Sequence, residues 1–220
     1  GWGKSAVYFV AAKYLLENRN KMTVIVSPLL SLTRNQILNA KNLLNIETIN
    51  TSEDPEKIRN TENKIKANKV DVLIVTPQRF FNRKFKEEHF HLIKERAGLF
   101  VVDEAHCISS WGHDFIPSYM MLVKKVIPSL NVDTSILFTT ATADNKVVED
   151  ISEKNNFSKT IKGDLLRKSL SVHSFGKQSF KFSIAWFKKN IDVLKGSGII
   201  YVLTTARADA VAQYLRNEVG

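Results

Sequence analysis

The sequence predicts an α/β fold built on a parallel sheet flanked by helices, and two features of its hydropathy pattern lead there. Short uncharged runs rich in Val, Ile and Leu recur along the 220 residues, which is typical of strands buried on both faces. Segments with helical periodicity separate these runs, and such alternation favours an open sheet covered by helices. In a sheet of this kind, ligands bind at the carboxyl ends of the strands.

Seven apolar runs are predicted strands. In order they read TVIVS (23–27), VDVLIVT (70–76), LFVVD (99–103), SILFTT (135–140), TIK (160–162), LSVHSF (170–175) and GIIYVL (198–203). The predicted helices between them are residues 5–17, 29–44, 55–68, 87–95, 117–127, 145–153, 180–194 and 207–217. The polar stretch 50–63 is interpreted as a connector running into a helix.

A domain junction is predicted near Gly163, where a polar stretch ends and the strand–helix pattern restarts. Residues 1–163 are expected to form a first α/β domain. Residues 164–220 are too few for a complete second domain of this kind, so they are interpreted as the beginning of one.

The chain is basic, with a formal net charge of +10 and a pI near 9.6. This excess favours a polyanionic partner, above all nucleic acid, although many proteins are basic without a specific reason. The single cysteine, Cys107, excludes a disulfide framework and a four-cysteine zinc site, and is expected to pack. We therefore expect a cytoplasmic protein, nucleoid-associated in a bacterium. No apolar window is long enough to cross a membrane.

The first five residues, GWGKS, match the end of the phosphate loop G-x-x-x-x-G-K-[ST]. In that loop, backbone N–H groups of Gly1 and Gly3 and the start of the following helix would hold phosphate oxygens. Lys4 would reach the β- and γ-phosphates, and Ser5 would hold Mg²⁺. The first glycine of the motif would precede residue 1, so a chance match is an equal alternative for this segment alone.

A second pair of candidate residues follows the run at 99–102. Asp103 at the end of this predicted strand suits a contact with Mg²⁺, because hard cations take oxygen ligands. Glu104 beside it suits polarisation of an attacking water. A strand that ends in solvated acids is the alternative, and the combination with Lys4 and Ser5 argues against it.

These motifs resemble those of RecQ-family DNA helicases, which belong to superfamily 2. The segment DEAHCISSWGHDF (103–115) is similar to their DEAH box and aromatic-rich loop, and this loop is the specific part of the resemblance. SPLLSL (27–32), TPQRF (76–80) and TATA (140–143) resemble motifs Ia, Ib and III, and GIIYVL (198–203) resembles the strand of motif IV.

The resemblance implies a RecA-like motor that uses ATP and Mg²⁺ to move 3′ to 5′ on DNA, with single-stranded and partially duplex DNA as partners. It implies that His106, Thr140 and Thr142 couple the nucleotide site to the DNA side. The residues it implies for nucleic-acid contact are Ser27, Pro28, Thr76, Arg79, Trp111, His113 and Phe115. Protein partners are not predicted.

Physical reasoning agrees with a role for the aromatic loop. Single-stranded nucleic acid binds where bases stack on exposed aromatic rings beside basic groups, at about 1–3 kcal/mol per base. Packing beneath a loop is the alternative for Trp111 and Phe115. Other aromatic and imidazole groups are expected to be structural: Phe80, Phe81, Phe85 and Phe90 in the core, and His89, His91 and His173 in the core or exposed.

Several family features are missing. The glutamine motif that reads adenine would precede residue 1, and motifs V and VI would follow Gly220. RKSL (167–170) stands where relatives carry Arg-Pro-Asn-Leu. We therefore interpret the chain as a fragment that alone hydrolyses ATP poorly. Two other functions remain open: a degenerate motor domain that binds DNA or acts as a scaffold without catalysis, and a motor that acts on RNA.

Overall fold

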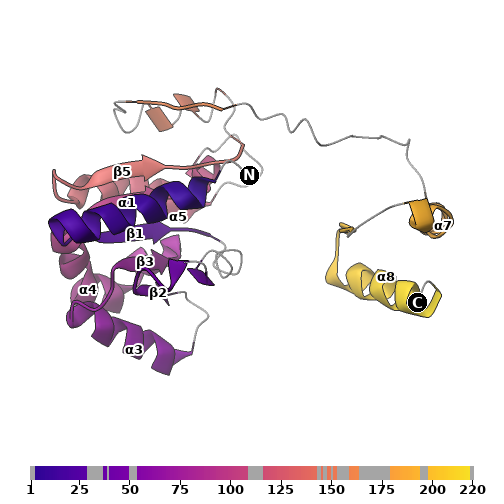
Figure 1. Ribbon diagram of the computed structural model, residues 1–220, viewed down its shortest axis with the longest axis horizontal. Helices are drawn as coiled ribbons and strands as arrows, with labels where there is room; N and C mark the ends of the chain where they lie inside the picture. The colour runs from indigo at the N-terminus through magenta and orange to yellow at the C-terminus, as the bar shows by residue number, and fades with distance from the viewer. Residues whose placement is uncertain are drawn as a thin grey trace. The chain divides into compact units, whose positions relative to one another are not determined.

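The computed structural model describes residues 3–28, 37–38, 40–49, 54–108, 116–142, 145, 148–149, 151–152, 159–163, 179–193 and 198–218. The chain divides into two compact units, Gly1–Leu165 and Leu166–Gly220. The first unit contains a sheet with helices around it, and the second contains helices α7 and α8 (Figure 1). The identity of the two units as motor domains stays a prediction.

The sheet has five strands in the order β2-β3-β1-β4-β5, and every neighbouring pair is parallel. The strands are β1 (Met22–Val26), β2 (Ile46–Ile49), β3 (Val72–Val75), β4 (Ala97–Val102) and β5 (Ser135–Phe138). This arrangement confirms the predicted α/β fold with a parallel sheet flanked by helices. Because all strands run the same way, their carboxyl ends lie along one edge.

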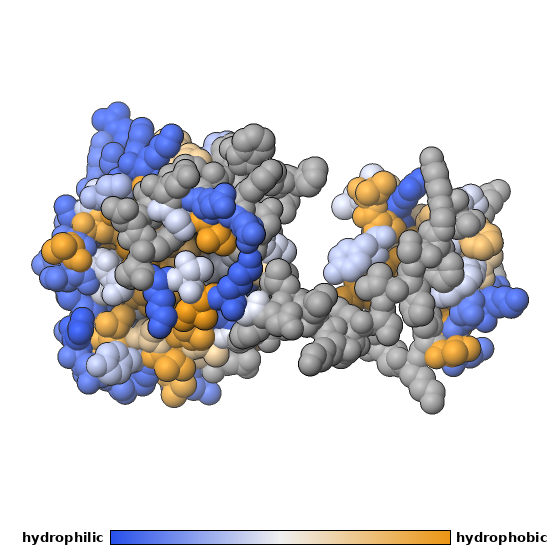
Figure 2. Space-filling model, turned by 90° about the horizontal axis from the view of Figure 1, so that it is seen from above, coloured by the Kyte–Doolittle hydropathy of each residue, from blue (hydrophilic) through white to orange (hydrophobic). Residues whose placement is uncertain are grey.

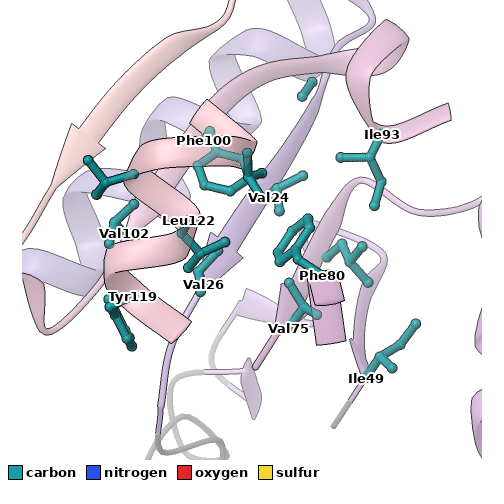
Figure 3. Close-up of a cluster of buried hydrophobic side chains, with 14 of the residues drawn as sticks. Val24, Val26, Ile49, Val75, Phe80, Ile93, Phe100, Val102, Tyr119 and Leu122 are labelled. Atoms are coloured by element: carbon teal, nitrogen blue, oxygen red, sulfur yellow. The ribbon is translucent and has the colours of Figure 1, made fainter. Parts of the chain in front are cut away.

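Two hydrophobic cores cover the two faces of the sheet, and alternate strand residues enter each. Val24 and Val26 of β1 lie in the larger core, whereas Ile25 between them lies in the other. The larger core includes Phe80, Phe100 and other side chains shown in Figure 3. Strands that are buried on both faces explain why their sequences are continuous apolar runs.

The first unit has four helices with complete bounds, each near a predicted one. They are α1 (Lys4–Arg19), α3 (Pro55–Lys66), α4 (Arg83–Arg96) and α5 (Pro117–Met121). Helix α1 packs on the smaller core through Tyr8 and Ala12, and the others pack on the larger core. The predicted helices at 29–44 and 145–153 fall largely outside the described residues.

Short helical turns join these elements at the ends of the strands. Four of them matter here: the 3₁₀ turns η1 (Pro77–Phe81), η2 (Ala105–Ile108) and η4 (Ile127–Ser129), and the π-helical segment η3 (Leu122–Val126). The predicted helix 117–127 is therefore real, but it changes its winding after Met121. The phenylalanines predicted as core are confirmed, because all four pack in or against the larger core.

Capping residues explain two helix starts. The Asp54 carboxylate accepts a hydrogen bond from the Glu56 N–H, and Pro55 occupies the first turn of α3. The Asn82 side chain accepts from the Phe85 N–H and begins α4 four residues before the predicted start. This cap was a signal in the sequence that the periodicity did not reveal.

A bulge in β4 lies at Gly98. Met22 of β1 pairs with Ala97, but the next residue, Thr23, pairs with Leu99, so β4 has one extra residue at this point. A Cβ atom on Gly98 would lie 2.6 Å from the Cβ of Lys21. Only glycine fits so close an approach, which explains why it interrupts an otherwise apolar strand.

One strand was not predicted, and two predicted strands are wrong. The strand β2 was missed because its sequence, IETI, is half polar and follows an expected helix. The predicted strands at 160–162 and 198–203 are wrong, since these residues have no strand structure. Ile161, Tyr201 and Leu203 are exposed, and no neighbouring strand among the described residues pairs with them. The predicted strand 170–175 lies outside the described residues.

The second unit is built from α7 (Phe180–Asn190), the 3₁₀ turn η5 (Ile191–Val193) and α8 (Thr205–Glu218). The Arg207 guanidinium lies 5.5 Å from the centre of the Phe180 ring and links the two helices. Figure 2 shows apolar side chains on the surface of this unit, and Phe182 and Trp186 are among its exposed large residues. Among the described helices of the whole chain, none has the length and apolarity to cross a membrane.

The bulge generates a prediction about stability. Gly98→Ala forces a methyl group against Lys21, so we expect the free energy of unfolding to fall by about 1–3 kcal/mol. Urea denaturation followed by circular dichroism measures this as a lower midpoint at an unchanged slope. Gly198→Ala is the control, because a Cβ there meets no atom within 4 Å. Equal midpoints for the two variants would contradict the close approach at Gly98.

Candidate active site

The start of α1 and the end of β4 come together although they are about 100 residues apart in the sequence. The Lys4 ammonium lies 4.0 Å from the Glu104 Oε1 atom, and both side chains are about one third exposed. Gly3 caps α1 with φ 70° and ψ 25°, a left-handed conformation that favours glycine. The structure therefore joins the two halves of the predicted nucleotide site.

Asp103 is fixed by three neighbouring elements. Its backbone N–H donates to the Val26 carbonyl at 2.9 Å, which continues the β1–β4 ladder. Its Oδ1 atom accepts from the Thr139 hydroxyl at 2.6 Å, and its carbonyl oxygen accepts from the Tyr119 hydroxyl at 2.8 Å. The backbone of Asp103 and one oxygen of its carboxylate are consequently hydrogen-bonded within the protein.

Glu104 has an unusual backbone. Its φ of 51° places a non-glycine residue in the left-handed region, which costs of the order of 1 kcal/mol. The Cys107 N–H donates to the Glu104 carbonyl at 3.0 Å and closes the turn η2. This turn directs the carboxylate of Glu104 toward Lys4 on one side and His106 on the other.

A chain of polar contacts leads away from Glu104. His106 Nδ1 lies 3.2 Å from Glu104 Oε2 and 3.0 Å from the Thr140 hydroxyl oxygen. The Thr142 N–H donates to that same hydroxyl at 3.2 Å. A proton on Nδ1 can be shared between the carboxylate and the hydroxyl, so the acid, the imidazole and the segment after β5 form one connected unit.

Two buried tyrosines flank the acids, and the sequence reasoning missed both. The pKa of Tyr8 is raised to about 12, mainly by burial; the charges of Asp103 and Glu104 also raise this pKa, and a hydrogen bond with Ser5 partly opposes the increase. Burial also raises the pKa of Tyr119. Both phenols therefore stay neutral at physiological pH. Tyr8 follows Ser5 by three residues on α1, and this spacing was the available signal.

The predicted nucleic-acid residues of motifs Ia and Ib are neighbours across β1 and β3. Val26 pairs with Val75, so Ser27 and Thr76 follow at the ends of adjacent strands. The Ser27 N–H donates to the Val75 carbonyl at 3.2 Å, and the Thr76 N–H donates to the Ile49 carbonyl at 3.3 Å. Both residues are buried, and Pro28 is partly exposed.

Arg79 points into the protein. Its Nη2 atom lies 2.8 Å from Glu62 Oε1 on α3, and the two side chains are only 10% and 7% exposed. His89 of α4 is fully buried beside this pair, with Nε2 3.6 Å from the same carboxylate oxygen. As predicted, His89 is a structural residue and His91 is exposed; His173 lies outside the described residues.

The remaining predicted residues, Gly1, Trp111, His113 and Phe115, lie outside the described residues. The residues on either side of the aromatic segment are described, and they meet. The Ile116 N–H donates to the Cys107 carbonyl at 3.0 Å, three residues from Glu104. Both ends of the segment are therefore attached to the turn that carries the acid. Cys107 is buried, as expected for a packing residue.

A parallel sheet whose carboxyl edge brings a lysine at the start of a helix close to an Asp-Glu pair is the arrangement of a RecA-like domain. Residues 1–151 match the DEAD/DEAH box helicase family, and the chain belongs to that family. Within the described residues, no cluster of three His, Cys, Asp or Glu side chains could hold a metal ion by protein ligands alone.

Curated relatives of the chain include RecQ helicases. The chain is 30% identical, over 99% of its length, to the ATP-dependent DNA helicase RecQ of Haemophilus influenzae and to that of Pasteurella multocida. It is 31% identical, again over 99%, to the ATP-dependent DNA helicase Q-like 5 of Arabidopsis thaliana. The chain covers 34%, 33% and 24% of these proteins, so it spans at most about a third of their length.

Solved structures share the fold at lower identity. The helicase domain of Pyrococcus furiosus Hef aligns with a TM-score of 0.53 and 18% identity over 72% of this chain and 32% of that one. The DEAD-box helicase Mss116, solved with single-stranded RNA and UDP-BeF, aligns with a TM-score of 0.57 and 18% identity, over 71% and 33%. These likenesses concern the RecA-like fold alone.

The buried His89 generates a prediction about pH. Burial lowers the pKa of His89 below its ordinary value of 6.5, and the nearby Glu62 carboxylate only partly opposes this; Lys66 and Arg79 lower it and Glu88 raises it. The unfolded chain therefore binds this proton more readily than the folded one. Stability that is complete above about pH 6.5 is lost as the pH falls below that value.

Urea denaturation between about pH 7.5 and 5.5 measures the effect. His89→Leu removes the titrating group, so we expect the midpoint of this variant to depend less on pH than that of the wild type. His91→Leu on the same helix is the control and should keep the wild-type dependence. Identical pH profiles for wild type and His89→Leu would show that His89 does not contribute.

Proposed function

We propose that the chain is a motor domain of an ATP-dependent DNA helicase or translocase that couples ATP hydrolysis to single-stranded DNA binding and duplex unwinding. The observation that carries the proposal is the continuous contact chain from Lys4 through Glu104 and His106 to Thr140. The 30% sequence identity to RecQ DNA helicases supports DNA as the substrate. The 3′-to-5′ direction follows from the family resemblance. A helicase that acts on DNA would lie in the cytoplasm of a bacterium, in association with the nucleoid.

The nucleotide is assigned to the N-terminus of α1. Gly1 and Gly3 would offer backbone N–H groups to the phosphates, and Lys4 would place its positive charge on the terminal ones. Ser5 and Asp103 offer hydroxyl and carboxylate oxygens, the donor set that Mg²⁺ prefers, and Asp103 is already oriented by Thr139. Bound Mg²⁺ would neutralise charge that develops on the phosphates.

Glu104 is the proposed general base. Its Oε1 faces Lys4 and its Oε2 faces His106, so the carboxylate lies between the phosphate-binding lysine and the coupling residues. A carboxylate in this place can accept a proton from the attacking water. When a bound nucleotide draws Lys4 away from Glu104, the carboxylate keeps only its contact with His106. His106 contacts the Thr140 hydroxyl, which accepts from the Thr142 N–H, so the loss of the Lys4 contact would reach these two threonines.

The DNA side is assigned to two groups of residues. Ser27, Pro28 and Thr76 lie at the ends of β1 and β3. Arg79 follows in η1, but its side chain pairs with Glu62 inside the protein. Trp111, His113 and Phe115 belong to the segment whose two ends are joined beside Glu104 by the Ile116–Cys107 hydrogen bond. Bases that stack on the aromatic rings would act on the same turn that holds the general base.

The first experiment concerns the base. Glu104→Gln keeps the size of the side chain but removes its ability to accept a proton, so in the full-length protein we expect DNA-stimulated ATP turnover to fall by about 10²–10⁴-fold. Binding of a fluorescent ATP analogue should persist. Glu17→Gln, which removes an exposed contact with Lys13, is the matched control and should turn over normally.

Unchanged turnover in Glu104→Gln would remove this residue from the role of base. A wild-type protein that binds DNA but neither binds nor hydrolyses ATP would favour the degenerate, non-enzymatic alternative. Stimulation by single-stranded RNA equal to that by DNA would favour an RNA substrate.

The second experiment concerns the aromatic segment. Trp111→Ala removes a stacking surface worth about 1–3 kcal/mol per base, so we expect single-stranded DNA to stimulate the ATPase about 10-fold less than in the wild type. The measurement is ATPase rate against DNA concentration in the full-length protein. Trp186→Ala, on helix α7, is the control and should retain full stimulation. Full stimulation in both variants would remove Trp111 from DNA sensing.

A further inference from the structure

We propose that Arg79 is a positioning residue: its buried ion pair with Glu62 sets the turn η1, and thereby Thr76, for DNA, while Arg79 itself does not contact a phosphate. This inference deepens the proposed function and rests on it, because the readout is DNA binding. It gives Arg79 a different role from the phosphate contact that the resemblance implies.

The ion pair is closed to solvent on most sides. Arg79 Nη2 and Glu62 Oε1 are 2.8 Å apart, and neither side chain is more than 10% exposed. The Phe85 ring covers the guanidinium, with Arg79 Cζ 5.2 Å from the ring centre. A phosphate could reach this guanidinium only if Arg79 left Glu62, and a buried carboxylate would then lack its counter-charge.

His89 completes the enclosure as a neutral group. It is fully buried, its ring centre lies 5.5 Å from that of Phe85, and its Nε2 is 3.6 Å from Glu62 Oε1. At the outer edge, the Lys66 ammonium lies 3.2 Å from Glu88 Oε2. Helices α3 and α4 are thus linked to each other and to η1 by charged and aromatic groups around Arg79.

The backbone of Arg79 transmits this anchoring to the DNA side. Its N–H donates to the Thr76 carbonyl at 3.0 Å, and its carbonyl accepts from the Asn82 N–H at 3.1 Å. Asn82 in turn caps α4. Arg79 is therefore hydrogen-bonded both to the end of β3, where Thr76 lies beside Ser27, and to the residue that caps α4.

The chain offers a matched exposed pair four residues away. Arg83 Nε and Glu87 Oε1 are 2.9 Å apart, close to the buried distance, but their side chains are 90% and 61% exposed. Both pairs join an arginine to a glutamate near the start of α4. They differ in burial and in whether the arginine backbone carries the turn at Thr76.

The experiment uses the full-length protein and labelled single-stranded oligo(dT). Dissociation constants and ATPase rates against DNA concentration are measured for Glu62→Gln, Arg79→Lys, Arg79→Met and the Glu62→Gln/Arg79→Met double variant. We expect each single change to weaken DNA binding about tenfold. The DNA concentration for half-maximal stimulation of the ATPase should rise, and kcat at saturating DNA should stay at the wild-type value.

Non-additivity is the signature of one positioning unit. The double variant should bind DNA within about twofold of either single variant, because the second change removes nothing further. Arg83→Met is the control and should bind as the wild type does. Circular dichroism and urea midpoints establish which variants fold. If Arg79→Met does not fold, DNA binding by Glu62→Gln and Arg79→Lys decides between the positioning role and a direct phosphate contact.

A direct phosphate contact predicts the opposite pattern. Glu62→Gln would release Arg79 and leave DNA binding equal or tighter, while Arg79→Met would weaken it and lower the slope of log affinity against log salt by about one. That result overturns the positioning role and leaves the proposed function intact. A wild-type protein that does not bind single-stranded DNA at all would overturn both.

Discussion

The backbone ladder that runs from β1 through β4 to β5 is the interaction on which the rest of the site depends. Val26 accepts from the Asp103 N–H, and Val102 accepts from the Thr139 N–H, so three strands end in step. Because the ladder is parallel, the residues that follow each strand arrive at the same edge. The Thr139–Asp103 and His106–Thr140 contacts are consequences of this alignment rather than independent features.

The candidate site contains conformations and buried polar groups that cost free energy, and these lie beside the most deeply buried strands of the sheet. Glu104 adopts a left-handed backbone, and two tyrosine hydroxyls are buried close to acidic groups. Each of these costs free energy, and the fully buried strands Val24–Val26 and Phe100–Val102 supply the stability that tolerates them. An orientation that is fixed before the ligand binds does not have to be created during the reaction.

Much of the fold, and the meeting of Lys4 with Glu104 in the candidate site, could be predicted from the sequence, and the reason is physical. Short apolar runs rich in Val, Ile and Leu are typical of strands in a parallel sheet, so β1, β3, β4 and β5 were found. The motifs at the start of α1 and at the end of β4 predicted that Lys4 and Glu104 meet, and they lie 4.0 Å apart. The strand β2 was missed because Glu47 and Thr48 give it a polar sequence. The runs at 160–162 and 198–203 were wrong because a strand needs a partner, and hydropathy does not report one.

The burial of Arg79 was beyond the reach of sequence reasoning for a related cause. Its partner Glu62 lies on a different helix, 17 residues earlier in the sequence, and neither residue type is usually buried unless it is paired. A charged residue in a motif is naturally interpreted as a contact for a charged ligand. Only tertiary structure distinguishes that role from an internal counter-ion. The same limit applies to Tyr119, whose hydroxyl bonds to the Asp103 carbonyl.

The bulge at Gly98 also determines which face of the sheet each later residue of β4 meets. Side chains alternate along a strand, so one extra residue at its beginning reverses the direction of every side chain after it. Asp103 lies five residues beyond Gly98, about 17 Å along the strand. The alternation of side chains at the carboxyl end of β4 is therefore set at the opposite end of the strand, by a residue without a side chain. The side-chain alternation along β4 is therefore counted from Gly98.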